Sequence, residues 1–413
     1  MTSRSRRHVS LTGFVALLLT FLGWAITPSV AGGAWLWPFC FFISLPLGCL
    51  ALLQIHALTG GRWGDLVGRD CVAAARTLVW VPLAFLPIAL MADDLYPWAR
   101  PHEVSSYQSE WLTLGNFQIR AFFYLTAWAS SAVAISHGWK HRCGVKRSPE
   151  QTSSQQVPTP SQYRFWPRPH ATAALLILFF LTTTFAAIDW MMSLAPHFHS
   201  SIFGAHFSVA CLLSGVAFVS LRQAGWLNAD QPGDGFSPGI LVDRDSTTAS
   251  VQPEDSNDRG NLLLAAVMVW MYFVFSQFFI AWSGNLPDEA NWYFVRSEFP
   301  WNAVAVVMVV LGFALPLATL LSRDVKQQPQ RLAIVAAAAL VARLLETLWL
   351  VVPSLPHSPF SLHWLDISSC VALGCLWLRA FEYERSRTPP LCMPQAAELK
   401  SPTGRSSEAS SQA

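Results

Sequence analysis

The sequence predicts an all-α polytopic membrane protein with ten transmembrane helices, on three observations. Of the 413 residues, 53% are apolar and only 13% are charged, and the mean hydropathy is +0.36. The apolar residues form ten stretches, each long enough for the roughly 20 residues of helix that a hydrocarbon core of about 30 Å requires. Lys and Arg concentrate in every second gap between these stretches.

The stretches are too long and unbroken to be strands of a membrane barrel, and lipid tolerates no open backbone structure other than a helix. We therefore expect helices, and we expect the third to be kinked because Pro82 and Pro87 lie within it. The expected spans are residues 11–29, 35–58, 71–94, 117–138, 171–194, 201–222, 261–282, 302–322, 331–352 and 364–382.

The distribution of basic residues predicts the orientation of the helices. If the N-terminus is cytoplasmic, the basic residues of both tails and of alternate loops fall on the cytoplasmic side, and the other side holds only Arg100, Arg120 and Arg296. The reverse orientation inverts this asymmetry, against the tendency of Lys and Arg to remain in the cytoplasm. We expect both termini in the cytoplasm.

The chain divides into one membrane domain and its tails. We expect a cytoplasmic tail over residues 1–10, the ten-helix domain over 11–383 and a disordered tail over 384–413. The cytoplasmic loops 143–162 and 227–258, rich in Ser, Pro, Gln, Gly or Asp, should also be disordered. The first span also fits a signal peptide ending near Ala31, but we expect a retained helix.

Several classes of function lack their motifs in this sequence. It contains no Walker loop, no GxGxxG opening a helix and no basic patch typical of nucleic-acid binding. No CxxC pair points to a zinc or iron–sulfur site. The histidines clearly inside spans, His56 and His206, belong near opposite faces, so we expect no haem between them. We expect no covalent or metal cofactor and no nucleic-acid partner.

Function must therefore be sought in the polar groups of the spans, because a charge at mid-bilayer costs several kcal/mol unless it is paired or hydrated. Arg343 and Glu346 lie at i and i+3 in the ninth span, on one helix face, where they can neutralise each other. The pair can be a packing device, or Glu346 can exchange protons.

A second polar group lies in the fifth span. Thr182, Ala186 and Asp189 share a helix face that Ser193 continues, so a carboxylate lies about one turn from the outer surface. His197 follows in a short loop. The group can accept protons from a quinol and release them outward, or Asp189 can be a helix cap at the membrane surface.

Weaker candidates lie in three other spans. Asp94 ends the third span, and Ser276 and Gln277 lie in the seventh, where hydrogen bonds between helices are the simplest role. Gln54 and His56, near the cytoplasmic end of the second span, can begin a proton path towards Glu346 and Asp189 or can be satisfied packing groups.

Several segments, taken together in order and spacing, resemble one family of membrane subunits. They are Leu58-Thr59-Gly60-Gly61-Arg62-Trp63-Gly64, Ile119-Arg120-Ala121-Phe122-Phe123-Tyr124, Thr184-Phe185-Ala186-Ala187-Ile188-Asp189-Trp190-Met191-Met192-Ser193-Leu194, Gly260-Asn261-Leu262-Leu263, Ser276-Gln277-Phe278, Trp282-Ser283-Gly284-Asn285-Leu286-Pro287 and Leu321-Ser322-Arg323-Asp324. They are similar to the second quinone-binding subunit of bacterial alternative complex III, a quinol:electron-acceptor oxidoreductase, and to NrfD-type (polysulfide-reductase) membrane subunits. The resemblance covers residues 10–383.

The resemblance implies a protein of the bacterial inner membrane, with eight helices in two four-helix bundles, two extra helices and no bound haem. It implies quinone or quinol as the substrate. Its partners would be iron–sulfur and multihaem cytochrome c subunits and a homologous NrfD-type sister subunit. The positions that it carries over are Asp189, Ser276, Gln277, Arg343 and Glu346.

The leading hypothesis is therefore a respiratory membrane subunit that contributes quinone binding, proton transfer or both, without its own redox metal. Its candidate residues are Asp94, Asp189, His197, Ser276, Gln277, Arg343 and Glu346. The alternatives are a secondary transporter, which would favour broken helices and a mid-bilayer site, and a purely structural assembly subunit.

Overall fold

A computed structural model describes residues 3–99, 111–144, 169–223, 253–355 and 363–389. The described residues form helices and no strands, and ten of the helical segments are long and apolar enough to cross a membrane, which confirms the predicted fold class. The helices are α1 (Ser3–Ile26), α2 (Pro28–Thr59), α3 (Arg62–Arg76), η1 (Thr77–Val79), α4 (Val81–Leu90), α5 (Ala92–Leu95), η2 (Pro97–Ala99), α7 (Leu114–Gly144), α8 (Pro169–Trp190), η5 (Met192–Leu194), α9 (Phe203–Gln223), α10 (Pro253–Gly284), α11 (Pro287–Ser297), α12 (Trp301–Val309), η6 (Val310–Ala314), α13 (Leu315–Leu320), α14 (Arg323–Gln327), α15 (Pro329–Val351), η7 (Val352–Ser354) and α16 (Trp364–Arg387).

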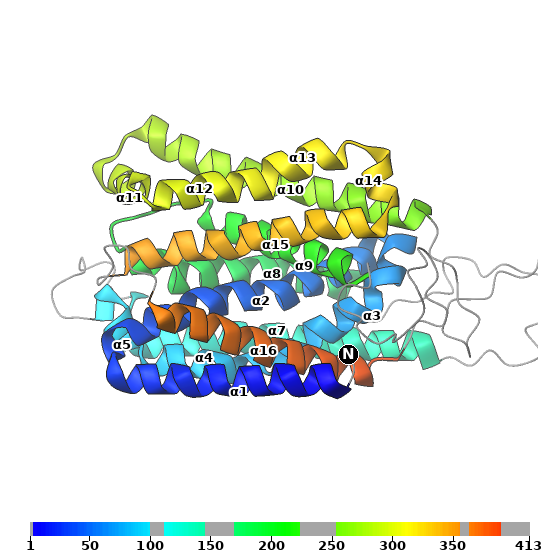
Figure 1. Ribbon diagram of the computed structural model, residues 1–413, viewed down its shortest axis with the longest axis horizontal. Coiled ribbons are helices and arrows are strands. Elements are labelled where there is room, and N and C mark those ends of the chain that lie inside the picture. Colours follow the sequence, from blue (N-terminus) through cyan, green and yellow to red (C-terminus); the bar gives the residue numbers. More distant parts are fainter. Residues whose placement is uncertain (1–2, 100–110, 145–168, 224–252, 356–362, 390–413) are drawn as a thin grey trace, which may run out of the picture.

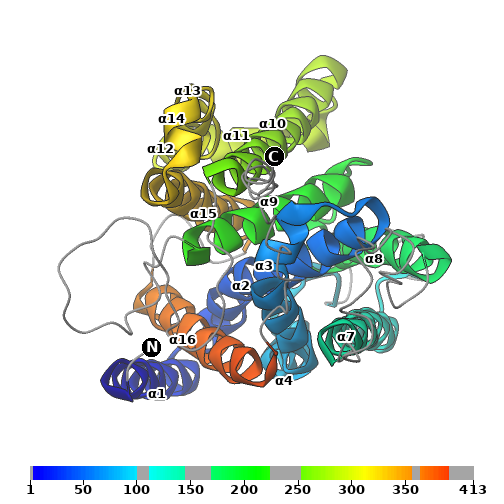
Figure 2. The same ribbon diagram turned by 90° about the vertical axis from the view of Figure 1, so that its right-hand side faces the viewer.

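The long helices lie side by side in two groups of four and one pair (Figures 1 and 2). One group consists of α2, α3 with α4, α7 and α8, and the other of α9, α10, α12 with α13, and α15. The pair α1 and α16 packs against α2 and α3. Helix α1 begins and α16 ends at one end of the assembly, here called the terminus end; the opposite end, which carries α5 and α11, is called the cap end (Figure 1).

The two groups meet where α2 crosses α9, and this contact requires glycine. A Cβ on Gly48 would collide with the backbone of Cys211 and Gly215, and one on Gly215 would collide with the backbone of Gly48. Small residues at helix crossings let the two backbones approach closely. This strengthens van der Waals packing, on which helix association depends in a membrane, because the hydrophobic effect does not drive helices together in lipid. Beside the crossing, Ser44 donates to Ser214 across the same interface at 3.0 Å.

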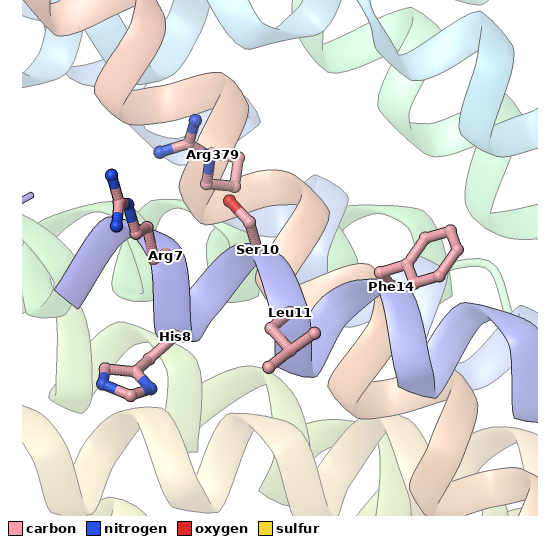
Figure 3. A pocket seen from close by; sticks show the side chains of 6 residues that line it. All are labelled: Arg7, His8, Ser10, Leu11, Phe14 and Arg379. Atoms are coloured by element: carbon pink, nitrogen blue, oxygen red, sulfur yellow. The ribbon is translucent and has the colours of Figure 1, made fainter. Parts of the chain in front are cut away.

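Helix α1 lies at the edge of the assembly, and most of its surface faces outward. It packs on α16 through small residues, because Cβ atoms on Gly13 and Gly23 would press on Cys375 and Leu365. Thr20 donates to Ser368 between these two contacts, at 3.2 Å. Figure 3 shows the terminus end of this pair, where Arg379 of α16 lies beside the first turns of α1.

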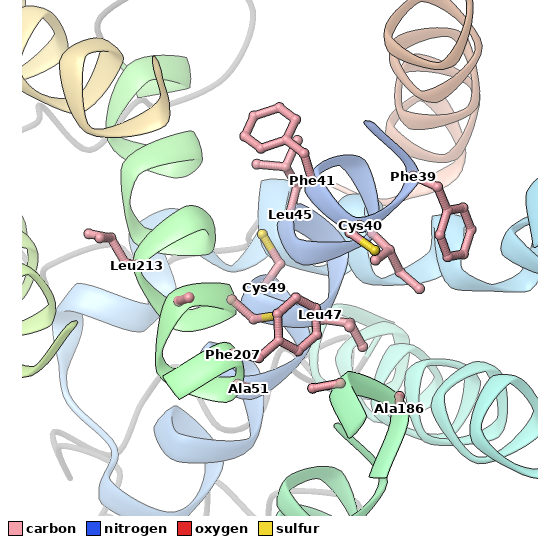
Figure 4. Packing of buried hydrophobic residues seen from close by; sticks show 14 of the residues in the cluster. Phe39, Cys40, Phe41, Leu45, Leu47, Cys49, Ala51, Ala186, Phe207 and Leu213 are labelled. Atoms are coloured by element: carbon pink, nitrogen blue, oxygen red, sulfur yellow. The ribbon is translucent and has the colours of Figure 1, made fainter. Parts of the chain in front are cut away.

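The centre of the molecule is an apolar core built on α2, which is buried along nearly its whole length. Part of this core is drawn in Figure 4, in which Leu47 and Ala51 of α2 are shown with Ala186 of α8 and Phe207 of α9. A helix buried on all sides must be apolar all round, which is why its sequence lacks an amphipathic pattern.

Two spans are irregular, and prolines explain both. The predicted kink in the third span is confirmed: α3 ends at Arg76 and a 3₁₀ turn precedes α4, whose second residue, Pro82, has no N–H to donate. The eighth span contains the π-helical turn Val310–Ala314, just before Pro316. By contrast, α2 continues through Pro38 and Pro46 without a break.

Several helix ends differ from the predicted boundaries. Helix α2 begins at Pro28 rather than at residue 35, and α7 runs to Gly144, just inside the predicted loop 143–162. Helix α1 begins at Ser3, inside the predicted tail 1–10, since nothing in that segment opposes a helix. Helix α10 begins at Pro253, inside the predicted loop 227–258, because proline suits the first turn of a helix. Helix α16 runs to Arg387 rather than ending at residue 382, and so enters the predicted tail 384–413. Most of both predicted disordered loops, and of the C-terminal tail, lies outside the described residues.

Candidate functional site

Asp189 lies on the last turn of α8, near the cap end, with its side chain buried. The predicted face is confirmed, because Thr182, Ala186, Asp189 and Ser193 are all buried. Trp128 of α7 donates to the Thr182 hydroxyl at 2.8 Å, so this face packs against α7. Asp189 therefore points between helices, not to the lipid.

Arg120 and Tyr124 of α7 hold the Asp189 carboxylate. Arg120 donates from Nε to Oδ2 at 2.8 Å and from Nη2 to Oδ1 at 2.9 Å, a two-pronged ion pair. The Tyr124 hydroxyl also donates to Oδ2, at 2.8 Å. Charge-assisted hydrogen bonds of this kind fix both the position and the direction of a carboxylate. The Trp111 ring covers one face of the Arg120 guanidinium, with 4.4 Å between Cζ of Arg120 and the centre of the ring.

Aromatic rings enclose this ion pair on its inner side. Trp190 packs edge-on against Trp128 and Tyr124, and on its other side it contacts Phe85. On the outer side, Phe122 of α7 points outward and is 72% exposed. The carboxylate thus lies between an apolar interior and a helix surface that faces the membrane.

Glu346 is the centre of a second polar group, formed by α9, α10 and α15. The predicted pairing is present: Arg343 forms an ion pair with Oε2 of Glu346, one helix turn away. Nε2 of His206 lies 2.6 Å from Oε1, and the Trp270 indole donates to both carboxylate oxygens, at 3.0 and 3.1 Å. Arg343 also donates to Ser214, at 3.3 Å. All these side chains are buried, so the group is closed to lipid.

The π-helical turn in the eighth span helps to place Trp270. A Cβ on Gly312, within this turn, would press on the far edge of the Trp270 ring at 2.8 Å and on Ala342 at 3.0 Å. A larger residue here would push the indole towards Glu346. Gly312 therefore leaves enough space for the Trp270 ring to lie where its indole N–H can donate to the Glu346 carboxylate.

The Glu346 group continues towards the cap end. Gln277 of α10 is buried and lies near both His206 and Tyr293 of α11. One turn further along α11, the buried Arg296 donates to the carbonyls of Trp349 and Leu350 at the end of α15, at 3.1 and 2.9 Å.

Arg296 therefore ties α11 to the helix that carries Glu346. Its guanidinium lies 3.4 Å from the centre of the Trp292 ring, and it also donates to Ser354, at 2.7 Å. Burial lowers the pKa of Arg296 well below its usual value, because a desolvated cation is disfavoured.

The remaining predicted candidates lie apart from these two groups. Asp94 on α5 and His197 in the link after α8 have exposed side chains at the cap end, and Ser276 is half-buried beside Gln277. At the other end of α2, His56 Nε2 lies 2.9 Å from the Gly61 carbonyl, and Gln54 donates to the Leu175 carbonyl at 3.4 Å. His56 and His206 thus lie near opposite ends of the bundle, as predicted.

Sequence reasoning missed the partners that come from other helices: Arg120 and Tyr124 for Asp189, and His206 and Trp270 for Glu346. One signal could have identified Arg120. It follows the start of the fourth span by one or two turns, and Asp189 lies one turn before the end of the fifth, so two consecutive antiparallel helices place opposite charges at the same depth. Among the residues that the structure describes, no three His, Cys, Asp or Glu side chains are grouped to hold a metal ion.

No protein-family model matches this chain, and no curated protein sequence matches it either.

Proposed function

We propose that this chain is an integral membrane subunit of a respiratory quinol:electron-acceptor oxidoreductase of the bacterial inner membrane, contributing quinone binding and transmembrane proton transfer. The observation that carries the proposal is the buried Asp189 carboxylate, fixed by Arg120 and Tyr124 behind a helix surface that faces the membrane. The motif resemblance to the second quinone-binding subunit of alternative complex III supports the same reading.

The chemistry of quinol oxidation explains why such a carboxylate would be useful. Oxidation of a quinol to a quinone releases two electrons and two protons, and the protons need a base within hydrogen-bonding reach. Asp189 would accept a proton from a quinol hydroxyl, and Arg120 would hold the carboxylate in place. The electrons would pass to iron–sulfur and cytochrome c subunits, because the protein supplies orientation and electrostatics while a redox centre carries the electrons.

Glu346 would serve proton transfer rather than quinol binding. It is enclosed by Arg343, His206 and Trp270, so a lipid-sized substrate has no access to it. A carboxylate next to an imidazole can exchange a proton with it, and Gln277 lies between that imidazole and the cap end. Asp94 and His197 lie exposed at this end and would receive protons that leave the bundle.

Purification in mild detergent tests membership of the complex. Co-elution with subunits that carry c-type haem and iron–sulfur clusters is the expected result. A chain that elutes alone and binds a small solute would instead indicate a transporter and refute the proposal.

The Asp189→Asn variant tests the chemistry within the intact complex. It keeps the shape and removes the base, so quinol-dependent electron transfer should fall about 10²-fold or more, as for loss of a general base. Asp93→Asn, an exposed carboxylate at the same end of the bundle, is the matched control and should leave turnover unchanged. Equal turnover in both variants would remove Asp189 from the proton route.

A further inference from the structure

Helices α1 and α16 run antiparallel in a fixed register, which can be extended to the terminus end. Gly13 faces Cys375 and Thr20 bonds Ser368, so seven residues along α1 match seven residues back along α16. Continued one turn past Cys375, the same register brings Arg379 level with the α1 turn between Arg7 and Ser10. Arg7 of α1 and Arg379 of α16 therefore lie at the same depth along the helix pair.

The two helices border an open cavity at this depth, on the outer surface of the bundle and away from Asp189 and Glu346. Its volume is about 590 Å³, and it is lined by Arg7, His8, Ser10, Leu11, Phe14 and Arg379. In Figure 3, Arg7 and Ser10 lie on the edge of α1 that is nearest to Arg379 of α16. Leu11 and Phe14 follow along α1, towards the middle of the membrane.

The charge of this cavity is positive and uncompensated. Within the described part of the chain, no carboxylate pairs with Arg7 or Arg379. The acidic residues on the following turn of α16 are engaged elsewhere: Glu382 lies 3.6 Å from Arg222, and Glu384 lies 2.6 Å from Arg76. The cavity is thus suited to an anion from outside the chain.

The apolar wall shows what kind of anion fits. Leu11 and Phe14 are 63% and 60% exposed, although they belong to a membrane-spanning helix, so they face hydrocarbon. A free phosphate ion would use only the arginines and leave this wall unoccupied. A lipid uses both parts, because its phosphate lies at the depth of the helix ends and its acyl chains lie further in.

We propose that this cavity is a binding site for an acidic phospholipid. Its phosphate pairs with the guanidinium groups of Arg7 and Arg379, which favour phosphate oxygens because they offer two parallel N–H donors. One acyl chain lies along Leu11 and Phe14. Basic pockets between transmembrane helices hold anionic head groups in this way. The bound lipid bridges Arg7 of α1 and Arg379 of α16 at the terminus end, beyond the Thr20–Ser368 hydrogen bond that joins the same two helices nearer the cap end.

Native mass spectrometry of the full chain in mild detergent, titrated with phosphatidylglycerol or with phosphatidylcholine of the same acyl chains, tests this site. The wild type should retain more phosphatidylglycerol than phosphatidylcholine. The double variant Arg7→Gln/Arg379→Gln should lose about 25-fold in affinity, roughly fivefold for each arginine. Arg379→Gln alone leaves α1 intact and should lose about fivefold, so the test stands if the double variant fails to fold.

The matched control is Arg323→Gln/Arg331→Gln, which removes two exposed arginines from the same end of the bundle, on other helices. It should bind within about twofold of the wild type. An equal loss in the control would mean a diffuse surface attraction and overturn the site. Displacement of the lipid by excess inorganic phosphate would mean that the cavity takes a free anion, and would overturn its assignment to a lipid.

Discussion

Replacing Glu346 by Gln should destabilise the protein by leaving Arg343 as an unpaired cation in the membrane. Arg343 is 1% exposed, so water cannot replace the lost carboxylate. Breaking a buried ion pair by removing one partner costs about 3–5 kcal/mol, and an arginine at the centre of a membrane helix costs about 2.5–3.5 kcal/mol on insertion scales. The glutamine oxygen can still accept from Trp270, so we expect the lower part of this range, about 3 kcal/mol.

Two further variants separate the charge from the shape of the side chains. Arg343→Met/Glu346→Gln removes both charges, and its loss should fall to about 1 kcal/mol, because a buried pair can be replaced by apolar groups at little cost. Arg343→Met alone should be milder than Glu346→Gln, because a carboxylate can become neutral by binding a proton and a guanidinium keeps its charge.

The measurement is reversible unfolding in mixed detergent, followed by tryptophan fluorescence. A loss of about 3 kcal/mol is a change of more than 100-fold in the ratio of folded to unfolded protein. Glu298→Gln, an exposed carboxylate at the cap end, is the control and should stay within about 0.5 kcal/mol of the wild type. If Glu346→Gln were as stable as this control, the two side chains would not depend on each other and the reasoning would be wrong.

Three other variants probe the contacts that position the two carboxylates. Gly48→Leu should destabilise the crossing of α2 and α9 by about 3 kcal/mol or more, whereas Gly115→Leu, at a position with open space, should not change the unfolding midpoint. Tyr124→Phe should cost about 1–1.5 kcal/mol in the same assay, by removing one hydrogen bond to the Asp189 carboxylate; no change would mean that Arg120 alone holds it. Arg296→Gln should speed hydrogen exchange in the last turn of α15, where the guanidinium covers two carbonyls; unchanged exchange would show that α11 does not hold that turn.

The ten spans could be predicted because the bilayer sets one length for every crossing helix, so a run of apolar residues is almost sufficient evidence. The helix ends were predicted less well, since no such length limits a helix outside the membrane. Helix α10, for example, begins at Pro253, several residues before its apolar run. Pro82 and Pro87 both predicted a kink in the third span; the break precedes Pro82, while α4 continues through Pro87. The π-helical turn depends on how Gly312 fits Trp270 and was not predictable.

Within the candidate site, contacts along one helix were predictable and contacts between helices were not. The pairing of Arg343 with Glu346 follows from helix geometry alone. The partners that α7 gives to Asp189 are more than sixty residues away in the chain, and Trp270, which donates to Glu346, resembles any other core aromatic in sequence. Knowing which helices adjoin, and at which depth, requires the structure.

The two carboxylates lie on either side of one helix contact, between α8 and α9. Thr183 of α8 and Ser208 of α9 share a hydrogen bond of 2.7 Å, and a Cβ on Gly204 would collide with Thr184, so the two helices touch along this segment. Asp189 follows one to two turns along α8, and His206, which contacts Glu346, lies on the same part of α9. Packed helices of this kind shift as units, so they can transmit a change at one site to the other when they have two arrangements. Under the proposed function, a proton bound or released at Asp189 would alter the attraction between α7 and α8, and α9 would be the element through which that change reaches Glu346.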